Sequence, residues 1–205
     1  MRRRGKFAAV KSRAIQGSED DGLRIIAGSA RGRKFDAPKG MDTRPTLERV
    51  KESLFGILQF ELEGSSVLDL FSGSGNLGLE AASRGAAYVV CNDRSRECAE
   101  QIQKNAQLLK LDGVVKTTCL DYANCVDRLK YEKKTFDFVF LDAPYADGTA
   151  AKAAERIFEA GILNEGARVI IEHASKLPPV VDASIAKAVD TRRYGVCAIT
   201  IYTRP

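Results

Sequence analysis

The sequence predicts an α/β protein with a mostly parallel, Rossmann-like sheet of seven strands covered by helices on both faces. Two observations predict it. From residue 66 onward, short apolar strands alternate with helical segments, and the first of these strands runs directly into a glycine-rich turn. Near-continuous apolar strands separated by helices require a parallel sheet that is buried on both faces. The chain of 205 residues is long enough for one such domain and too short for two large ones.

Ahead of this domain lies a small basic N-terminal extension. We expect residues 1–22 to form a disordered basic tail. Residues 23–63 predict a hairpin and a helix, with strands at Leu23–Gly28 and Gly32–Ala37 and with Thr46 as the helix N-cap.

The main domain is predicted to span residues 64–205. Its alternating segments predict five strands, at Val67–Phe71, Tyr88–Asn92, Val114–Cys119, Phe136–Leu141 and Arg168–Glu172. The helices between them are expected at Leu77–Arg84, Arg96–Leu109, Tyr122–Leu129 and Thr149–Ala160. Two further strands, Ala183–Val189 and Val196–Tyr202, close the sheet, and the last strand is expected to be antiparallel.

The glycine-rich turn is the first candidate binding site. Residues 67–78 read V-L-D-L-F-S-G-S-G-N-L-G, so Gly73, Gly75 and Gly78 fit the G-x-G-x-x-G spacing that nicotinamide dehydrogenases and methyltransferases share. Asp69 favours S-adenosylmethionine, because a carboxylate there suits an ammonium and a sulfonium and repels a pyrophosphate. The alternatives are a nicotinamide oxidoreductase and a strand–turn–helix that binds nothing.

Acidic residues follow the next two strands of the predicted sheet. Asp93, 18 residues past Gly75, is placed to accept hydrogen bonds from both hydroxyls of a ribose. Asp121, beside Tyr122, is placed to accept from an adenine amine, and it also suits a helix N-cap. The predicted cofactor-binding residues are Asp69, Phe71, Gly73, Ser74, Gly75, Asp93, Arg94, Asp121 and Tyr122.

The tetrapeptide Asp142-Ala143-Pro144-Tyr145 after the fourth strand is the candidate catalytic site. The lone pair of an exocyclic base amine is delocalised into the ring, and a carboxylate with nearby carbonyls that accept the amine hydrogens favours the nucleophilic nitrogen. Pro144 stiffens the loop, and Tyr145 offers a face on which an extruded base stacks. The alternative is a proline turn with a partly buried tyrosine.

Cysteine and histidine usage predicts no metal site. The five cysteines form no C-x-x-C pair, and His173, the one histidine, is expected to be a satisfied polar residue in a strand. No apolar run approaches the length of a membrane span and no signal-peptide pattern opens the chain, so we expect a cytoplasmic protein without a membrane partner.

Positive charge is concentrated near the N-terminus. Residues 1–60 contain 14 Lys and Arg against 7 Asp and Glu, whereas residues 61–205 contain 18 against 20. Basic segments of this kind attract phosphate backbones without reading base sequence. The candidate RNA-binding residues are Arg24, Arg31, Arg33, Lys34, Arg44 and Arg49.

Four stretches together resemble the RsmD family of bacterial 16S rRNA (guanine-N2) methyltransferases. They are R-I-I-A-G-S-A-R-G-R-K (24–34), T-R-P-T-L-E-R-V-K-E-S-L-F (43–55), V-L-D-L-F-S-G-S-G-N-L-G-L-E-A (67–81) and L-D-A-P-Y (141–145). The resemblance runs from Leu23 to Pro205. It departs from the family at Ala143, where the family usually has proline, and at Asn76, where it more often has alanine.

The resemblance implies a class I methyltransferase fold that transfers a methyl group from S-adenosylmethionine to a guanine N2 amine in the small ribosomal subunit. Asp142, Pro144 and Tyr145 would then hold and stack the guanine, and a monomer without metal would suffice. The open alternatives are a DNA or other RNA amino-methyltransferase, and an rRNA-binding assembly factor that lacks catalysis.

Overall fold

The computed structural model of the chain describes residues 23–38, 45–144 and 148–205. The predicted tail (1–22), Arg44 and Tyr145 lie outside the described residues.

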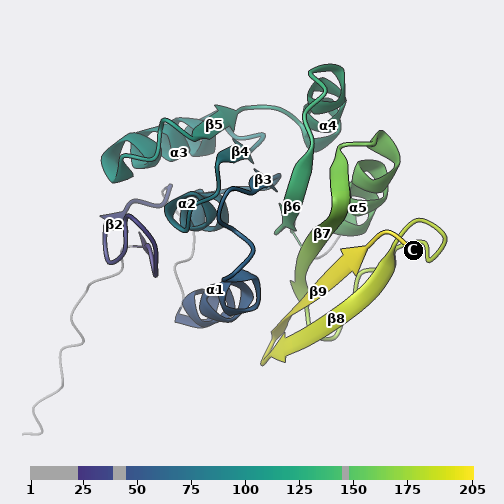
Figure 1. Ribbon diagram of the computed structural model, residues 1–205. Helices are drawn as coiled ribbons and strands as arrows, with labels where there is room; N and C mark the ends of the chain where they lie inside the picture. Colours follow the sequence, from purple (N-terminus) through teal and green to yellow (C-terminus); the bar gives the residue numbers. More distant parts are fainter. Residues whose placement is uncertain (1–22, 39–44, 145–147) are drawn as a thin grey trace, which may run out of the picture.

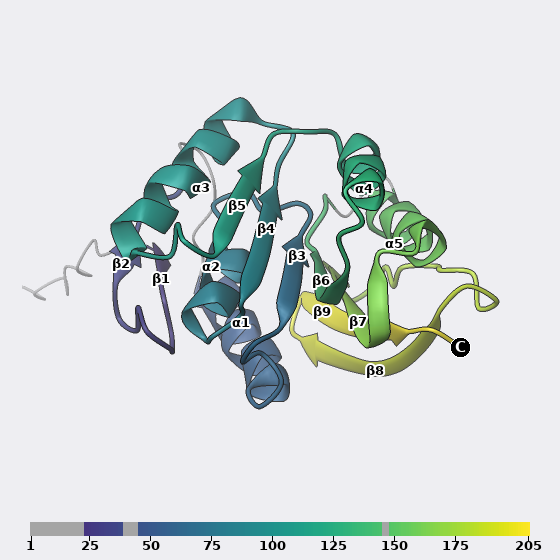
Figure 2. The same ribbon diagram turned by 45° about the horizontal axis from the view of Figure 1, so that its top comes forward.

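A seven-stranded sheet forms the centre of the molecule, with the strand order β5-β4-β3-β6-β7-β9-β8 (Figures 1 and 2). Neighbouring strands pair in parallel except for β9, which is antiparallel to both β7 and β8. The predicted sheet with its antiparallel last strand is therefore confirmed. The strands are β3 (Ser66–Asp69), β4 (Tyr88–Asn92), β5 (Val115–Thr118), β6 (Phe136–Leu141), β7 (Leu163–Ala174), β8 (Lys187–Tyr194) and β9 (Cys197–Thr203).

Helices cover both faces of this sheet (Figure 2). One face packs against α1 (Pro45–Leu58), α2 (Asn76–Ser83) and α3 (Arg96–Leu109), and the other packs against α4 (Tyr122–Tyr131) and α5 (Thr149–Ala160). Successive strand residues alternate between the two cores, as Val67 and Leu68 do in β3. No helix within the described ranges combines the length and the apolar character that crossing a membrane requires.

The N-terminal hairpin is shorter than predicted. Only Leu23–Arg24 (β1) pairs with Lys34–Phe35 (β2), because the amides of Ile26 and Ala27 donate to the Glu80 carboxylate at 2.8 and 3.0 Å instead of to a strand. Helix α1 begins at Pro45, a favoured first helical residue, so Thr46 lies within the helix and is not its N-cap.

The strands at the C-terminal end of the sheet differ most from their predicted bounds. β8 covers 187–194, not 183–189, because its register with β9 pairs Tyr194 with Cys197 and places the turn at residues 195–196. Most β8 side chains are exposed at the edge of the sheet, so the strand has no apolar alternation to mark its bounds. β7 begins five residues earlier than predicted, at Leu163, with a register shift opposite Phe136–Phe138.

The strand order reverses between β3 and β6, which lie side by side while the chain continues from β3 to β4 on the other side. Ligands of open α/β sheets bind in the crevice at the carboxyl ends of such a pair of strands. Asp69 ends β3 and Asp142 follows β6, so both acids lie at this crevice.

Candidate functional site

Two cavities open at the carboxyl edge of the sheet. The outer cavity has a volume of about 480 Å³ and the inner cavity about 160 Å³. Phe71, Gly73 and Asp142 line both, so these three residues form the shared wall. Among the other predicted residues, the outer cavity is lined by Asp93, Arg94, Asp121, Tyr122 and Pro144, and the inner cavity by Asp69 and Ser74.

The glycine turn brings the backbone close to this edge. Gly75 has a φ of 84°, a left-handed conformation that glycine adopts without strain, and it directly precedes α2. A Cβ atom on Gly78 would lie 2.3 Å from Cys91 Sγ, so only glycine lets α2 pack this closely against β4. Gly75 itself lines neither cavity, and it shapes the turn.

Asp69 is a buried carboxylate with one satisfied oxygen. Its side chain accepts a hydrogen bond from the Gly78 amide at 2.9 Å through Oδ2, whereas Oδ1 is buried and has no hydrogen-bond partner among the described residues. Burial raises the pKa of Asp69 to about 7. An orphaned buried oxygen of this kind needs a cationic or donor-bearing ligand.

Asp93 joins the glycine turn to the next helix. One carboxylate oxygen accepts from the Gly73 amide at 2.9 Å and the other from the Ser95 amide at 2.8 Å. Each oxygen retains a lone pair for a further donor.

Asp121 and Tyr122 lie at the start of α4. Asp121 caps this helix by accepting from the Ala123 amide at 2.9 Å, and it also lines the outer cavity. The Tyr122 ring lies 5.8 Å from that of Phe71, so two aromatic residues stand together in the wall of the outer cavity.

Asp142 is accessible from both cavities. Desolvation by the surrounding protein, followed by the nearby carboxylates of Glu172 and Asp69, raises its pKa well above the ordinary aspartate value. Ala143, the departure from the family motif, is buried, and Pro144 is exposed in the outer cavity.

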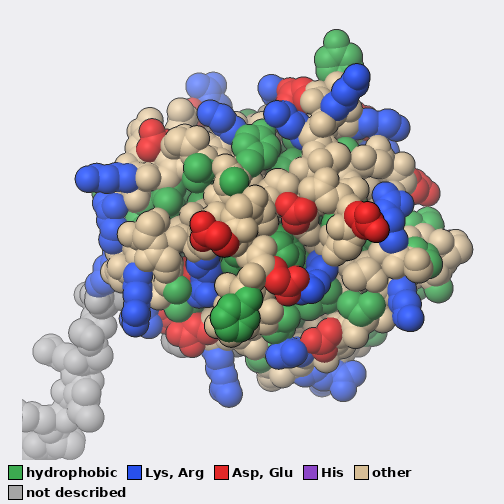
Figure 3. Space-filling model, in the orientation of Figure 1, with side chains coloured by type: hydrophobic (Ala, Val, Ile, Leu, Met, Phe, Trp, Pro, Cys, Tyr) green, Lys and Arg blue, Asp and Glu red, His purple; other side chains and the backbone are tan. Residues whose placement is uncertain are grey.

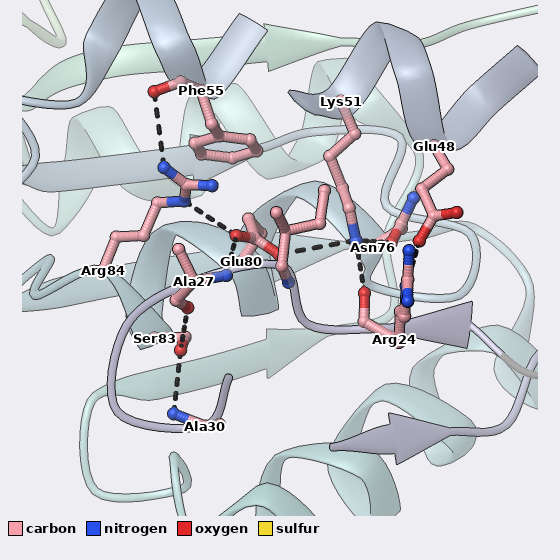
Figure 4. A network of polar contacts seen from close by, with 12 residues as sticks. Arg24, Ala27, Ala30, Glu48, Lys51, Phe55, Asn76, Glu80, Ser83 and Arg84 are labelled. Carbon is pink, nitrogen blue, oxygen red and sulfur yellow. Dashed lines mark hydrogen bonds and ion pairs between the residues drawn. The ribbon is translucent and has the colours of Figure 1, made fainter. Parts of the chain in front are cut away.

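A buried ion-pair network behind the inner cavity ties the N-terminal segment to the glycine turn (Figure 4). Lys51 of α1 donates to the carbonyl of Arg24 and to Asn76 Oδ1, both at 2.7 Å, and lies 3.4 Å from a Glu80 oxygen. The other Glu80 oxygen accepts from Arg84 Nε at 2.7 Å. Burial lowers the pKa of Lys51, and its nearby carboxylate partially offsets this.

The predicted RNA-binding residues have different surroundings. Arg31, Lys34 and Arg49 are exposed, whereas Arg24 forms an ion pair with Glu48. Arg33 donates to the carbonyls of Leu108 and Leu109, which places its charge at the C-terminus of α3. In Figure 3, Lys and Arg side chains surround the outline of the molecule, and several project beside the hairpin.

Three residues that line or support the cavities, Asn92, Lys51 and Glu172, are absent from the site residues that the sequence predicts. Asn92 accepts from the Leu120 amide and donates to the Leu70 carbonyl, which holds two loops of the outer cavity in place. Lys51 and Glu172 line the inner cavity. Asn92 and Glu172 have the signal that identified Asp142, a polar residue ending an apolar strand, whereas Lys51 lies in a helix whose face is not evident from sequence.

His173 is a satisfied polar residue in a strand, as the sequence predicts. His173 is buried and satisfied, with Nε2 2.9 Å from Thr200 Oγ1 and Nδ1 3.0 Å from the Ala174 carbonyl. Four of the five cysteines are buried, and Cys119 is exposed. Across the described ranges, no three His, Cys, Asp or Glu side chains group closely enough to hold a metal ion.

The sheet order and the glycine turn at the switch point define the fold of the class I, S-adenosylmethionine-dependent methyltransferases. A family model described as conserved hypothetical protein 95 matches residues 23–203. The chain belongs to this family, which is the RsmD family that its motifs indicate.

Sequence and structure relatives agree with this placement. The chain is 33% identical to ribosomal RNA small subunit methyltransferase D of Haemophilus influenzae, over 88% of this chain and 93% of the relative. It is 32% identical to the putative rRNA methyltransferase YlbH of Bacillus subtilis, over 89% of this chain and 99% of the relative. The solved structure of the putative methyltransferase yhhF from Escherichia coli matches with a TM-score of 0.76 and 31% identity, over 89% of this chain and 97% of that one.

Proposed function

We propose that this chain transfers a methyl group from S-adenosylmethionine to ribosomal RNA of the small subunit, and that the acceptor is the exocyclic N2 amine of a guanine in 16S rRNA. The observation that carries the proposal is the position of Asp142 in the wall between two cavities. The residues that suit the donor line both cavities, and a donor held by them would meet the base at this carboxylate. The names of the relatives support ribosomal RNA as the substrate.

The residues at the turn fit the donor. Asp69 presents a buried oxygen that has no partner in the described part of the chain, which suits the cationic part of S-adenosylmethionine. Asp93 and Asp121 offer acceptors for the ribose hydroxyls and the adenine amine, and the paired rings of Phe71 and Tyr122 offer an apolar wall. Bound there, the donor supplies a methyl group already activated by its positive sulfur.

Asp142 prepares the acceptor in this proposal. Its carboxylate accepts a hydrogen of the amine, which favours a nitrogen lone pair that is free to attack. When the nitrogen has gained the methyl group it carries a positive charge, and its proton passes to a base. A carboxylate with a raised pKa suits this role. Pro144 and Tyr145 would hold and stack the base, and Ala143 supplies a backbone carbonyl without the ring of the usual proline.

Mapping methylated nucleotides by mass spectrometry tests the proposal. Ribosomal RNA from cells with and without the protein is digested and compared. The expected difference is one N2-methylguanine in 16S rRNA that disappears with the gene. Unchanged 16S rRNA together with a lost methyl group in DNA or another RNA would assign the enzyme to the alternative substrate class.

Replacing Asp142 by alanine should lower kcat for methylation of unmodified small subunits by about 100- to 1000-fold, because the amine loses its acceptor. Calorimetry should show that the variant still binds S-adenosylhomocysteine. Asp112→Ala, at an exposed turn position, is the matched control and should leave both measurements unchanged. Wild-type protein that binds subunits but yields no product would instead support the assembly factor, for which Ala143 is the structural argument.

A further inference from the structure

Glu172 is a second acid at the edge where Asp142 lies. Strands β6 and β7 are parallel neighbours, and Leu141 pairs with Ile171, so Asp142 and Glu172 follow at the same level of the sheet. Glu172 is buried, with 8% of its surface exposed, and it lines the inner cavity together with Asp142. Two carboxylates from adjacent strands therefore face one small space.

The two acids influence each other across this cavity. Desolvation raises the pKa of Asp142, and the like charge of Glu172 raises it further. Lys51 lines the same cavity, but its ammonium donates to the Arg24 carbonyl and to Asn76. A paired acid site of this kind suits a ligand that presents two neighbouring N–H donors.

Guanine presents two neighbouring N–H donors of this kind. Its N1 carries a hydrogen next to the N2 amine, so two donors lie side by side. In adenine and cytosine, the ring nitrogen next to the exocyclic amine carries a lone pair instead. A carboxylate facing that lone pair would be repelled, whereas facing the N1–H of guanine it accepts a hydrogen bond.

We propose that Glu172 accepts the N1–H of the target guanine while Asp142 meets the N2 amine, so that Glu172 selects guanine over adenine and cytosine. The inference rests on the proposed function and adds to it the residue that distinguishes the base. Enzymes that act on an extruded base recognise it through hydrogen bonds to its Watson–Crick edge, which in guanine includes N1 and the N2 amine.

The test compares guanine with 2-aminopurine, which keeps the N2 amine but has a lone pair at N1. Each base is placed at the mapped position of reconstituted small subunits, and kcat/KM is measured for both. Wild type should prefer guanine by about 100-fold or more, because a site built for a donor rejects an analogue without it. In Glu172→Gln, the amide donates to N1 of 2-aminopurine, so the preference should fall at least about 10-fold.

Glu165→Gln is the matched control, since Glu165 is exposed near the start of the same strand. It should keep the wild-type preference. An unchanged preference in Glu172→Gln would overturn the inference, as would a change confined to KM for S-adenosylmethionine, which would assign Glu172 to the donor.

If Glu172→Gln does not fold, as judged by its melting curve, Glu172→Asp replaces it in the assay. Glu172→Asp keeps the carboxylate and should still reject 2-aminopurine. Equal kcat/KM values of this variant for guanine and 2-aminopurine would overturn the inference. Wild type that leaves guanine N2 unmethylated would refute the proposed function itself, so the two failures are distinguishable.

Discussion

At the scale of single residues, the site depends on acids that are costly to the protein without a ligand. Asp69 is the clearest case, because it is buried and one of its oxygens has no partner within the described ranges. Burial favours the neutral form and raises its pKa from 3.8 to about 7. The same carboxylate that suits a cationic donor therefore destabilises the folded protein when it ionises.

The variant Asp69→Asn should reveal this cost in the pH dependence of stability. In wild type the unfolded chain ionises Asp69 above its ordinary pKa of 3.8, whereas the folded protein resists ionisation until pH reaches about 7. Stability is therefore lost as pH rises through this window, by about 1.4 kcal/mol per unit. The free energy of unfolding of Asp69→Asn relative to wild type should rise by roughly 3 kcal/mol between pH 5 and pH 8.

Denaturant unfolding at several pH values measures this difference. Parallel curves for the two proteins would mean that Asp69 has an ordinary pKa in the folded state. S-adenosylhomocysteine is omitted from these measurements, because a ligand that binds only the folded state changes the apparent stability.

The sequence can reveal a site residue when its position at the end of a strand already determines where it lies in the fold. Asp69 ends an apolar strand, and Asp93 and Asp142 each follow one. Because parallel strands bring their carboxyl ends to one edge, the motif and the topology place the three acids together. Lys51 could not be found in this way. It enters the inner cavity from α1, and that depends on how the helix packs, which local pattern does not determine.

At the scale of elements, helix α2 is the support for both the glycine turn and the N-terminal segment. Glu80 accepts from the Ile26 and Ala27 amides, while Ser83 Oγ donates to the Ala27 carbonyl and accepts from the Ala30 amide (Figure 4). Sequence patterns could predict α2 but not this docking, because its partners lie more than 50 residues apart. The docking of residues 26–27 on Glu80 also explains why the observed strand β1 is shorter than the predicted strand Leu23–Gly28.

Replacing Glu80 by glutamine should loosen this docking. The change leaves the buried Lys51 ammonium without its ion-pair partner and removes an acceptor from the 26–27 amides, at a cost of about 3 kcal/mol in unfolding free energy. Hydrogen exchange should show faster exchange at Ile26 and Ala27. Glu100→Gln, which removes an exposed pair with Arg96, should change neither quantity appreciably. Unchanged exchange at the two amides would mean that the charge of Glu80 does not hold the segment in place.

At the scale of the whole molecule, charge and cavities are separated along the chain. The first 60 residues carry the net positive charge, and the remainder, which contains the acids of the site, is slightly negative. Figures 1 and 2 both show the hairpin at the opposite end of the molecule from α4 and α5. If the hairpin and α1 form the RNA-facing surface, binding should depend on where positive charge lies and not only on its total.

The double variant Arg31→Gln/Arg49→Gln tests this with two exposed residues of that surface. Each lost phosphate contact lowers the slope of log K against log salt by roughly 0.7 to 0.9, so the pair should lower it by about 1.5. Lys130→Gln/Lys152→Gln removes the same charge from exposed positions on α4 and α5 and should leave the slope nearly unchanged. Binding of unmodified small subunits is measured at several salt concentrations for both variants. Equal losses in the two variants would show that the RNA senses only net charge. A loss confined to the first pair assigns the contact to the hairpin and α1, and α1 carries Lys51, which lines the inner cavity with Asp142.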